Sequence, residues 1–576
     1  MLKKHLPFLI LLVFLGLYLR NFHLFELFRS HDLEIHGARL ANYYLAYRQG
    51  QFPPRWAPNL NYGFGYPVFI VSYALLHLIG LIFYIVSNSI EVSLNLTIML
   101  SIISAGWGMY VLGKQKGLPW LGLVLSSLYL TTPYSMATIF IRGALAEITF
   151  LGLLPWIFVG IDRFFRHPLL PLLSIIYELI FAAFLLSHPP SLVVSLPIIG
   201  LYVLVKSKIH KVSLLALRPL LYICVTALLL TSFFWLPFLA EKQFVRAGLG
   251  FSTADYAQKF ADPKSLLWSP WTYGGLQTTA HSGDFTYRVG LIYFLILFTL
   301  LITPKFRRQP QIKYWLMIAM GGSFMLTPWS NFIWQIFPPL QSVQFPWRLL
   351  WVPSLAICLA LSNLSNTDFK QLKYLSILIV AIALHHIIFY AYPAGYISNS
   401  DFAWLNYPGT GSSNGEYDPI WFDNHQNMRL NERLVGRVSG VNLFTKDDQT
   451  GRGDITADIN SWFGSAMNYT ISTPEDIDVL QQTAYFPGWK VWVDGVDTPI
   501  KYQDLEFSGR IIFPVSLGTH EIKTAFTENT LDRKAGDYFT LLGLGIIGIQ
   551  TMKLISTRKI FARFHINYNP VTRFHK

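Results

Sequence analysis

The sequence has few charged residues and almost no cysteine. Charged residues make up 13% of the 576 residues and hydrophobic residues 52%, whereas soluble domains carry roughly 25% charged residues. A soluble fold is therefore excluded for most of the chain, and a membrane protein is expected. The two cysteines, Cys224 and Cys358, lie inside apolar runs, so neither a disulfide framework nor a cysteine-based metal site is expected.

The N-terminal segment "MLKKHLPFLILLVFLGLYL" lacks the small-residue cleavage site of a secretory signal. Its basic flank and apolar run predict an uncleaved first helix. The net charge of +13 does not indicate nucleic-acid binding, because Lys and Arg cluster in short loops between apolar runs. That is the distribution expected of cytoplasmic loops in a membrane protein.

The chain contains thirteen apolar runs that approach the roughly 20 residues needed to cross a bilayer. They lie near 5–21, 66–86, 91–112, 118–134, 147–163, 169–187, 189–205, 214–240, 289–303, 312–328, 346–364, 372–392 and 536–556. An odd number of crossings would place the basic C-terminal tail outside. If 66–86 stays on the outer side, every basic loop falls inside. We therefore expect about twelve crossings of the plasma membrane with both termini cytoplasmic; the alternative is that 118–134 or 289–303 is not a span.

This topology predicts three parts. Residues 1–392 form a transmembrane domain whose first external loop is 22–90, and residues 534–576 form a last helix and a basic tail. Residues 393–533 form an extracytoplasmic, mostly β domain, because alternating runs such as "WKVWVDG" and "GRIIFPVSLG" are typical of a small antiparallel sandwich. Asp494-Gly495 predicts a hairpin turn. Trp489 and Trp492 are expected in its core, with contact to a glycan as the alternative.

Ionisable residues gather just after the first apolar run, in "HDLEIH". They are His31, Asp32, Glu34 and His36, and ionisable groups near hydrocarbon usually mark function. On a helix, Asp32 and His36 share a face, whereas in an extended turn Asp32 and Glu34 converge. The alternative is that Asp32 simply caps an amphipathic helix.

Arginines also lie on the predicted outer side, against the usual inside bias. Arg39, Arg48 and Arg55 follow in the first external loop, and guanidinium groups bind phosphate oxygens bidentately. The partner is a lipid-linked phosphate or an ordinary phospholipid headgroup. Arg142 with Glu147, and Arg348 beside the predicted belt residue Trp347, are further candidates; structural ion pairs or snorkelling anchors are the alternative. His188 is expected in a turn, His385 and His386 in packing, and His281 and Asp284 are weak candidates for substrate contact.

Several stretches resemble a known family of membrane enzymes. They are "HDLEIH", "RWAPNLNYGFGYPVF", "RGALAE", "QFPWRLL", "GEYDP" and "YFPGWKVWVDG". In this order they resemble the GT-C superfamily of glycosyltransferases, which use polyprenyl-phosphate-linked sugars. Within it the chain is similar to the YfhO-type group, which includes the 6-pyruvoyl-tetrahydropterin-synthase-related family, a label that implies no pterin chemistry.

The resemblance implies a GT-C-like fold and Asp32 as the catalytic base. It also implies a lipid-donor groove lined around Tyr62, Gly65 and Pro67. The oligosaccharyltransferase branch of the superfamily binds a metal through carboxylate pairs on two loops. Here the second external loop contains Glu147 instead of such a pair. The sequence therefore leaves open whether the protein binds a divalent cation, Mg²⁺ or Mn²⁺.

These observations predict an inverting transfer of a sugar from a polyprenyl phosphate to an envelope glycan, lipid or protein. Asp32 would act as base with Glu34 as a second catalytic carboxylate. The cations Arg39, Arg55, Arg142 and Arg348 would stabilise the leaving phosphate, with His31 and His36 orienting the base or the sugar. A non-catalytic glycan flippase or an assembly scaffold is the alternative, although a transporter would show charged residues deep in several spans.

Overall fold

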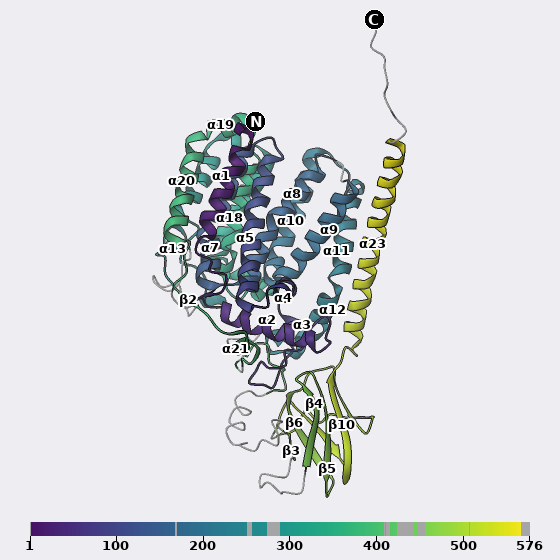
Figure 1. Ribbon diagram of the computed structural model, residues 1–576. Coiled ribbons are helices and arrows are strands. Elements are labelled where there is room, and N and C mark those ends of the chain that lie inside the picture. The colour runs from purple at the N-terminus through teal and green to yellow at the C-terminus, as the bar shows by residue number, and fades with distance from the viewer. Residues whose placement is uncertain are drawn as a thin grey trace.

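The computed structural model consists of a helical body with a β-sandwich attached at one end (Figure 1). It describes residues 2–167, 170–249, 256–273, 288–407, 409, 415–422, 443–445, 456–505 and 507–565. The expected candidates His281 and Asp284 lie outside the described residues.

The helices follow the apolar runs of the sequence, and each of the thirteen expected spans contains one. Pro stands at the first or second position of α6, α9, α10, α11 and α16, where its missing N–H has no intrahelical partner to lose. The helices of the body are α1 (Leu2–Leu19), α2 (Leu33–Arg48), α3 (Val68–Val71), α4 (Ala74–Ser87), α5 (Ile90–Lys114), α6 (Pro119–Leu130), α7 (Pro133–Ala137), α8 (Leu145–Phe164), α9 (Pro171–Ser187), α10 (Pro189–His210), α11 (Arg218–Leu230), α12 (Ser232–Glu241), α13 (Pro263–Leu267), α14 (Leu291–Ile302), α15 (Pro304–Arg307), α16 (Pro310–Met325), α17 (Asn331–Ile336), α18 (Trp351–Ser362), α19 (Asn366–Gln371), α20 (Lys373–Tyr390), α21 (Asp401–Leu405) and α23 (Leu531–His565).

By length and composition, five helices in the described part of the chain can cross a membrane, namely α5, α8, α10, α20 and α23. Two bent helix pairs raise the number to seven. The first joins α6 to α7 and its π-helical extension η1 (Thr138–Arg142) with a bend of 51°, and the second joins 214–230 to 232–244 with a bend of 67°. Five shorter apolar helices accompany them, among them α9, α14 and His5–Leu19 of α1. The count of about twelve crossings therefore stays a prediction.

The segment 66–86 contains α3 and α4, separated by Ser72 and Tyr73. With 14 residues, α4 is about 21 Å long, less than the roughly 30 Å of a bilayer core. Helix α2 lies across the end of the body that faces the sandwich (Figure 1). Several helices in runs that are expected to cross, such as α6 and α14, are shorter still, so the placement of 66–86 stays a prediction.

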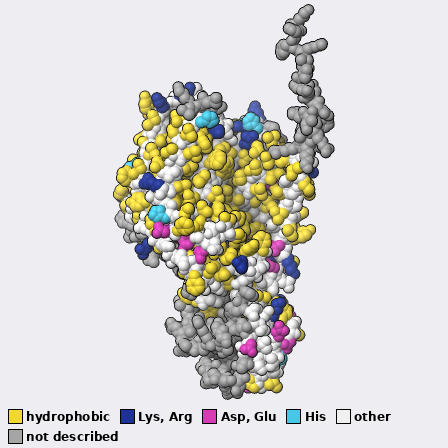
Figure 2. All heavy atoms as spheres, in the orientation of Figure 1, with side chains coloured by type: hydrophobic (Ala, Val, Ile, Leu, Met, Phe, Trp, Pro, Cys, Tyr) yellow, Lys and Arg dark blue, Asp and Glu magenta, His cyan; other side chains and the backbone are white. Residues whose placement is uncertain are grey.

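The two ends of the helical body differ. The start of α1 and the C-terminal end of α23 lie at the end opposite the sandwich (Figure 1). Figure 2 shows hydrophobic side chains over most of the visible helical surface, and acidic side chains toward the sandwich end. An apolar belt between two polar ends is the arrangement that a bilayer requires.

The β-sandwich consists of two antiparallel sheets in which inward-facing apolar side chains interdigitate. One sheet has the order β4-β5-β10-β7-β8 and the other β3-β6-β9. The strands are β3 (Leu443–Thr445), β4 (Thr456–Phe463), β5 (Ala466–Thr473), β6 (Ile477–Ala484), β7 (Trp489–Val493), β8 (Val496–Thr498), β9 (Arg510–Val515) and β10 (Gly518–Phe526).

The hairpin expected at Asp494-Gly495 is present between β7 and β8. Both turn residues have positive φ, 50° and 78°, as a two-residue hairpin turn with right-handed strand twist requires. Trp489 is buried in the core, as expected, whereas Trp492 is half-buried with Lys523 over its ring.

The first part of the region 393–533 packs on the helical body. There β2 (Tyr396–Ile397) pairs with β1 (Leu27–Phe28). Trp404 of α21 is buried against Gly37 of α2 and donates a hydrogen bond to Glu91 at 2.6 Å. This return of the chain to α2 brings residues of the segment 415–422 to the start of the first external loop.

Candidate functional site

The site begins where α2 starts. Asp32 occupies the N-cap position, but its carboxylate caps no backbone N–H of α2, so the capping role considered for it is not realised. The backbone N–H groups of His31 and Asp32 donate to the carbonyl groups of Ile141 and Arg142 at 3.2 and 2.9 Å. The first external loop is thereby fixed to the end of η1.

Gly143 makes this close approach geometrically feasible. It has φ +62°, and a Cβ at this position would lie less than 3.0 Å from the Ser30 hydroxyl and the Leu33 side chain. Only glycine, which has no Cβ, adopts a left-handed conformation in so little space without strain. The "RG" of "RGALAE" therefore places Arg142 directly beside Asp32.

Arg142 and Glu147 form a buried, bidentate ion pair. The two guanidinium nitrogens donate to the two carboxylate oxygens at 2.6 and 2.9 Å, and Tyr134 donates its hydroxyl to the same carboxylate. Arg348 Nε lies 3.2 Å and His188 Nε2 lies 3.9 Å from Glu147 Oε1. Trp347, expected in an interfacial belt, is instead buried with its ring 5.0 Å from the Arg142 guanidinium; its position under this cation explains its burial.

Asp32 lies in the electrostatic field of this cluster. Burial raises the pKa of Asp32, while the guanidinium groups of Arg142 and Arg348 lower it and Glu147 raises it. Asp32 as a whole residue is half-buried. A carboxylate with a raised pKa, flanked by cations, has the properties of a general base next to an anion-binding site.

Arg39 forms the centre of a second, adjoining group. Its buried guanidinium lies 5.0 Å from the ring of Tyr417 and donates to Ser72 at 3.4 Å. Tyr73 connects the two groups. Burial raises the pKa of Tyr73, while the cations Arg348 and Arg39 lower it.

Other expected residues lie apart from Asp32. Helix α2 places Asp32 and His36 one turn apart. Of the two geometries considered for this segment, a helix and an extended turn, the structure therefore has the helix. Glu34 is exposed and, like Tyr62, interacts electrostatically with Tyr407. His36 is buried beside Arg39, and burial holds its pKa well below the usual value.

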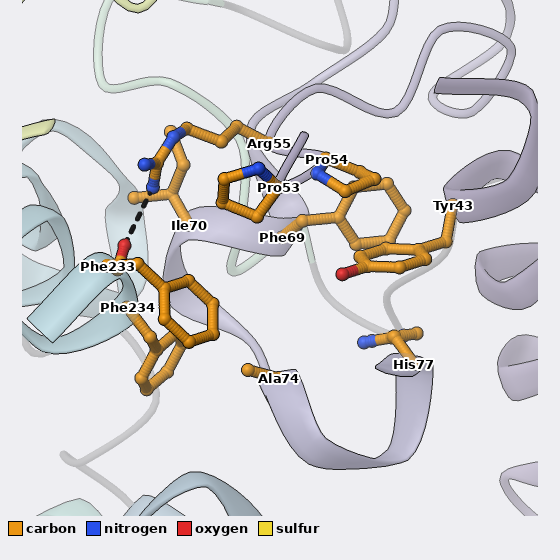
Figure 3. Close-up of a pocket in the computed structure, with 10 residues that line it drawn as sticks. All are labelled: Tyr43, Pro53, Pro54, Arg55, Phe69, Ile70, Ala74, His77, Phe233 and Phe234. Atoms are coloured by element: carbon orange, nitrogen blue, oxygen red, sulfur yellow. Dashed lines mark hydrogen bonds between the residues drawn. The ribbon is translucent and has the colours of Figure 1, made fainter. Parts of the chain in front are cut away.

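Arg55 has partners that the sequence did not predict. Its guanidinium bonds to Glu528, to Asp537 at 2.9 Å and to the Phe233 carbonyl at 2.9 Å. Figure 3 shows this side chain reaching Phe233 beside Pro53 and Pro54. Arg55 thus links the segment 22–90 to α12 and α23. The guanidinium N–H groups of Arg55 donate to these protein groups and not to a phosphate.

Sequence reasoning missed four residues of these groups, namely Tyr73, Tyr134, His188 and Tyr417. His188 does lie in the turn between α9 and α10, as expected, but its ring also faces Glu147. The only signal for Tyr417 was its place in the quoted stretch "GEYDP". His386 packs within the helical body, as expected, and its Nδ1 lies 3.1 Å from the Thr131 carbonyl oxygen.

The donor set around Asp32 does not suit a metal. Within the described ranges, no group of three or more His, Cys, Asp or Glu side chains is placed to hold an ion. Both oxygens of Glu147 accept hydrogen bonds from Arg142. Glu147 is therefore engaged by Arg142, and a divalent cation would have to compete with a guanidinium group for its oxygens.

Comparison with solved structures finds similar chains at low identity. One is the arabinofuranosyltransferase AftD from Mycobacteria, with 12% identity, a TM-score of 0.39, and 69% of this chain and 28% of that chain covered. Another is ArnT from Cupriavidus metallidurans bound to undecaprenyl phosphate, with 14% identity, a TM-score of 0.34, and coverages of 66% and 64%. The chain thus spans less than two thirds of the length of either protein.

No curated protein matches the chain. A family model, described as a 6-pyruvoyl-tetrahydropterin synthase related domain of membrane proteins, matches residues 71–397, which is more than half of the chain. That range includes Arg142, Glu147, His188 and Arg348. The chain therefore belongs to the 6-pyruvoyl-tetrahydropterin synthase related family of membrane proteins.

Proposed function

We propose that the protein is a GT-C-type membrane glycosyltransferase that transfers a sugar from a polyprenyl phosphate to an acceptor at the sandwich end of the helical body. The observation that carries the proposal is the Asp32 carboxylate next to the guanidinium groups of Arg142 and Arg348. A base next to cations is the minimum that a sugar transfer from a phosphate donor needs. The extracytoplasmic side, the donor and the acceptor class (glycan, lipid or protein) are parts of this proposal.

Asp32 acts in the bond-forming half of the reaction. It accepts the proton of the acceptor hydroxyl as the hydroxyl oxygen attacks the anomeric carbon of the donor sugar. The bond between that carbon and the phosphate oxygen breaks, and its electron pair leaves with the lipid phosphate. A single displacement inverts the anomeric centre. The proton ends on Asp32 and is later lost to water.

The cations act on the leaving group. A lipid phosphate gains negative charge as it leaves, and it needs no proton if fixed guanidinium groups face it. Arg348 is half-buried and linked to Glu147, and Arg142 is held by the same carboxylate. Glu147 is therefore a positioning residue that fixes both guanidinium groups in the site.

Arg39 and its tyrosines lie where the rest of the donor would extend. The Arg39 guanidinium is sandwiched between Ser72 and Tyr417, close to Tyr73 and Tyr66. Aromatic rings with polar edges suit the faces and hydroxyl groups of a sugar. We assign this group to the sugar of the donor.

The test is sugar transfer by the purified protein in lipid nanodiscs. Radiolabelled polyprenyl-phosphate sugars are supplied with crude envelope acceptors. Asp32→Asn should lower turnover by about 10²- to 10⁴-fold, the usual contribution of general base catalysis, while donor binding is retained. We propose no catalytic role for Glu34, in contrast to the sequence-based expectation, because it is exposed and interacts with Tyr407; Glu34→Gln, in the first turn of α2, is therefore the matched control.

Three outcomes are informative. Equal turnover of wild type and Asp32→Asn would remove Asp32 as the base. Loss in Glu34→Gln of the same size would show that the effect is not specific to Asp32. If folded wild-type protein binds the lipid but transfers no sugar from any donor, a flippase or scaffold replaces the enzyme.

A further inference from the structure

The sandwich contains a buried arginine for which the structure provides no hydrogen-bond acceptor. Arg510, the first residue of β9, is 0% exposed, and its Nε, Nη1 and Nη2 atoms have no hydrogen-bond partner among the described residues. Native proteins rarely leave buried polar groups unpaired, and such exceptions need a reason. Burial lowers the pKa of Arg510 to about 10, so the guanidinium is still charged at neutral pH.

Two other fully buried arginines, Arg142 and Arg533, have a carboxylate partner. Arg142 is held by Glu147, and Arg533 by Glu241 through two bonds of 2.8 Å. An unpaired buried charge costs several kcal/mol, so the same fold that pairs these groups leaves one guanidinium without its counter-ion. An anion would supply the charge and the hydrogen-bond acceptors that this guanidinium lacks among the described residues.

Arg510 lies at the seam between the sandwich and the first external loop. Its guanidinium is 5.0 Å from the ring of Phe64 and 5.8 Å from that of Phe507. The backbone of Ala484, the strand partner of Arg510, donates to the Phe64 carbonyl at 2.9 Å. The β6–β9 pairing is irregular between Gln481 and Ala484, and such irregularities re-aim side chains near functional sites.

The loop at this seam is also strained and carries unpaired polar atoms. Asn61 and Tyr62 adopt the left-handed conformation, with φ of 58° and 57°. Asn61 is 0% exposed, and neither Nδ2 nor Oδ1 has a hydrogen-bond partner. Strained non-glycine residues cluster at ligand clamps. Asn61 lies three residues before Phe64, whose ring lies against Arg510, and the backbone N–H of Phe64 donates to the Asn61 carbonyl.

We propose that the seam between residues 58–66 and β9 binds an oxyanion, a phosphate or a carboxylate, through Arg510 with Asn61 as a second donor. The planar guanidinium fork matches either group bidentately. Because Arg510 is enclosed, residues 58–66 shift to admit the ligand and relax their left-handed turn when it binds. The site is on the sandwich side of the body and is separate from Asp32, so its occupancy does not depend on Asp32 acting as a base.

The same chemistry is available from two sources, a lipid-linked phosphate and an acidic sugar. Protein in nanodiscs is titrated with undecaprenyl phosphate, tetragalacturonic acid and inorganic phosphate in separate arms, and dissociation constants are measured. Arg510→Gln should weaken binding of the true ligand at least tenfold, and Arg510→Lys should retain part of the affinity. Lys501→Gln is the control, since this exposed lysine pairs only with Asp478 on the sandwich surface. The arm that responds identifies the source.

A second measurement needs no variant. Hydrogen–deuterium exchange of wild-type protein should change in residues 58–66 and β9 when the bound anion is added. Unchanged exchange with all three anions, or equal affinities of wild type and Arg510→Gln in every arm, would overturn the proposal. Sugar transfer is not used as a readout, so failure here is distinguishable from failure of the proposed activity.

Discussion

At the scale of single residues, the carboxylates of Asp32 and Glu147 differ in their partners, which supports the different roles that we propose for them. Glu147 has both oxygens bonded to Arg142, so its charge is neutralised where it lies. Asp32 caps no backbone N–H of α2, is half-buried as a whole residue and has a raised pKa. Only the second carboxylate is available to take up a proton, because a base needs a free lone pair within reach of its substrate.

The raised pKa of Asp32 predicts an acid limb in the pH profile. Below the folded-state pKa the carboxyl is protonated and cannot act as base, so kcat/KM should rise with pH through a value above the usual aspartate value of about 3.9. Arg348 lowers this pKa, so Arg348→Gln should move the limb to higher pH. A limb that stays in place in Arg348→Gln would contradict the electrostatic assignment.

Removal of the Glu147 charge should destabilise the fold. In Glu147→Gln, the buried Arg142 loses its counter-ion, and breaking one half of a buried pair costs about 3–5 kcal/mol. Thermal unfolding of the variant in detergent measures the loss. The exposed Glu34→Gln control should unfold like wild type. An unchanged melting temperature in Glu147→Gln would show that the cluster is more solvated than its geometry indicates.

At the scale of elements, the site depends on where helices start and stop. Helix α2 begins at Leu33 and η1 ends at Arg142, and the two ends are joined by backbone hydrogen bonds at His31 and Asp32. The sequence predicted the helix after Asp32 and the external position of Arg142. The sequence could not show that these two ends touch, because the spacing of apolar residues indicates the structure of one helix or strand and not its neighbours in space.

Gly143→Ala tests this junction. A Cβ at Gly143 would contact Ser30 and Leu33 at less than 3.0 Å, in addition to the left-handed strain of φ +62°. Gly117→Ala is the matched control, because Gly117 has φ +77° with nothing within 4 Å and carries only the strain of about 1–2 kcal/mol. Gly143→Ala should lose more stability and more activity than Gly117→Ala. Equal losses would show that the close approach is unimportant.

At the scale of the whole molecule, buried ion pairs link the sandwich to the helical body. Arg533, in the first turn of α23, bonds Glu241 of α12 and the carbonyl groups of Pro487 and Thr527. Arg55 binds Glu528 and Asp537 on the same side. These contacts hold the sandwich next to the first external loop, which brings Arg510 to the seam with residues 58–66.

A double-mutant cycle tests this link. Arg533→Met should leave Glu241 buried without a partner and cost about 3–5 kcal/mol, whereas Arg533→Met with Glu241→Gln should recover much of the loss. Unfolding midpoints of the four proteins give the coupling energy. Additive losses in the double variant would show that the pair does not act as a unit.

The sequence by itself determined the membrane class, the helix in each of the thirteen apolar runs, the hairpin at Asp494-Gly495 and the buried Trp489. These features follow from local patterns, because burial in lipid or in a sheet imposes a period on neighbouring residues. Tertiary structure decided which residues meet. It joined Arg142, His188 and Arg348 to Glu147 and brought Asp32 beside them, packed Tyr417 against Arg39, buried Trp347, and paired Arg55 with Asp537 of α23. Contacts between residues this far apart in the chain arise from packing of whole elements, on which local composition carries no information.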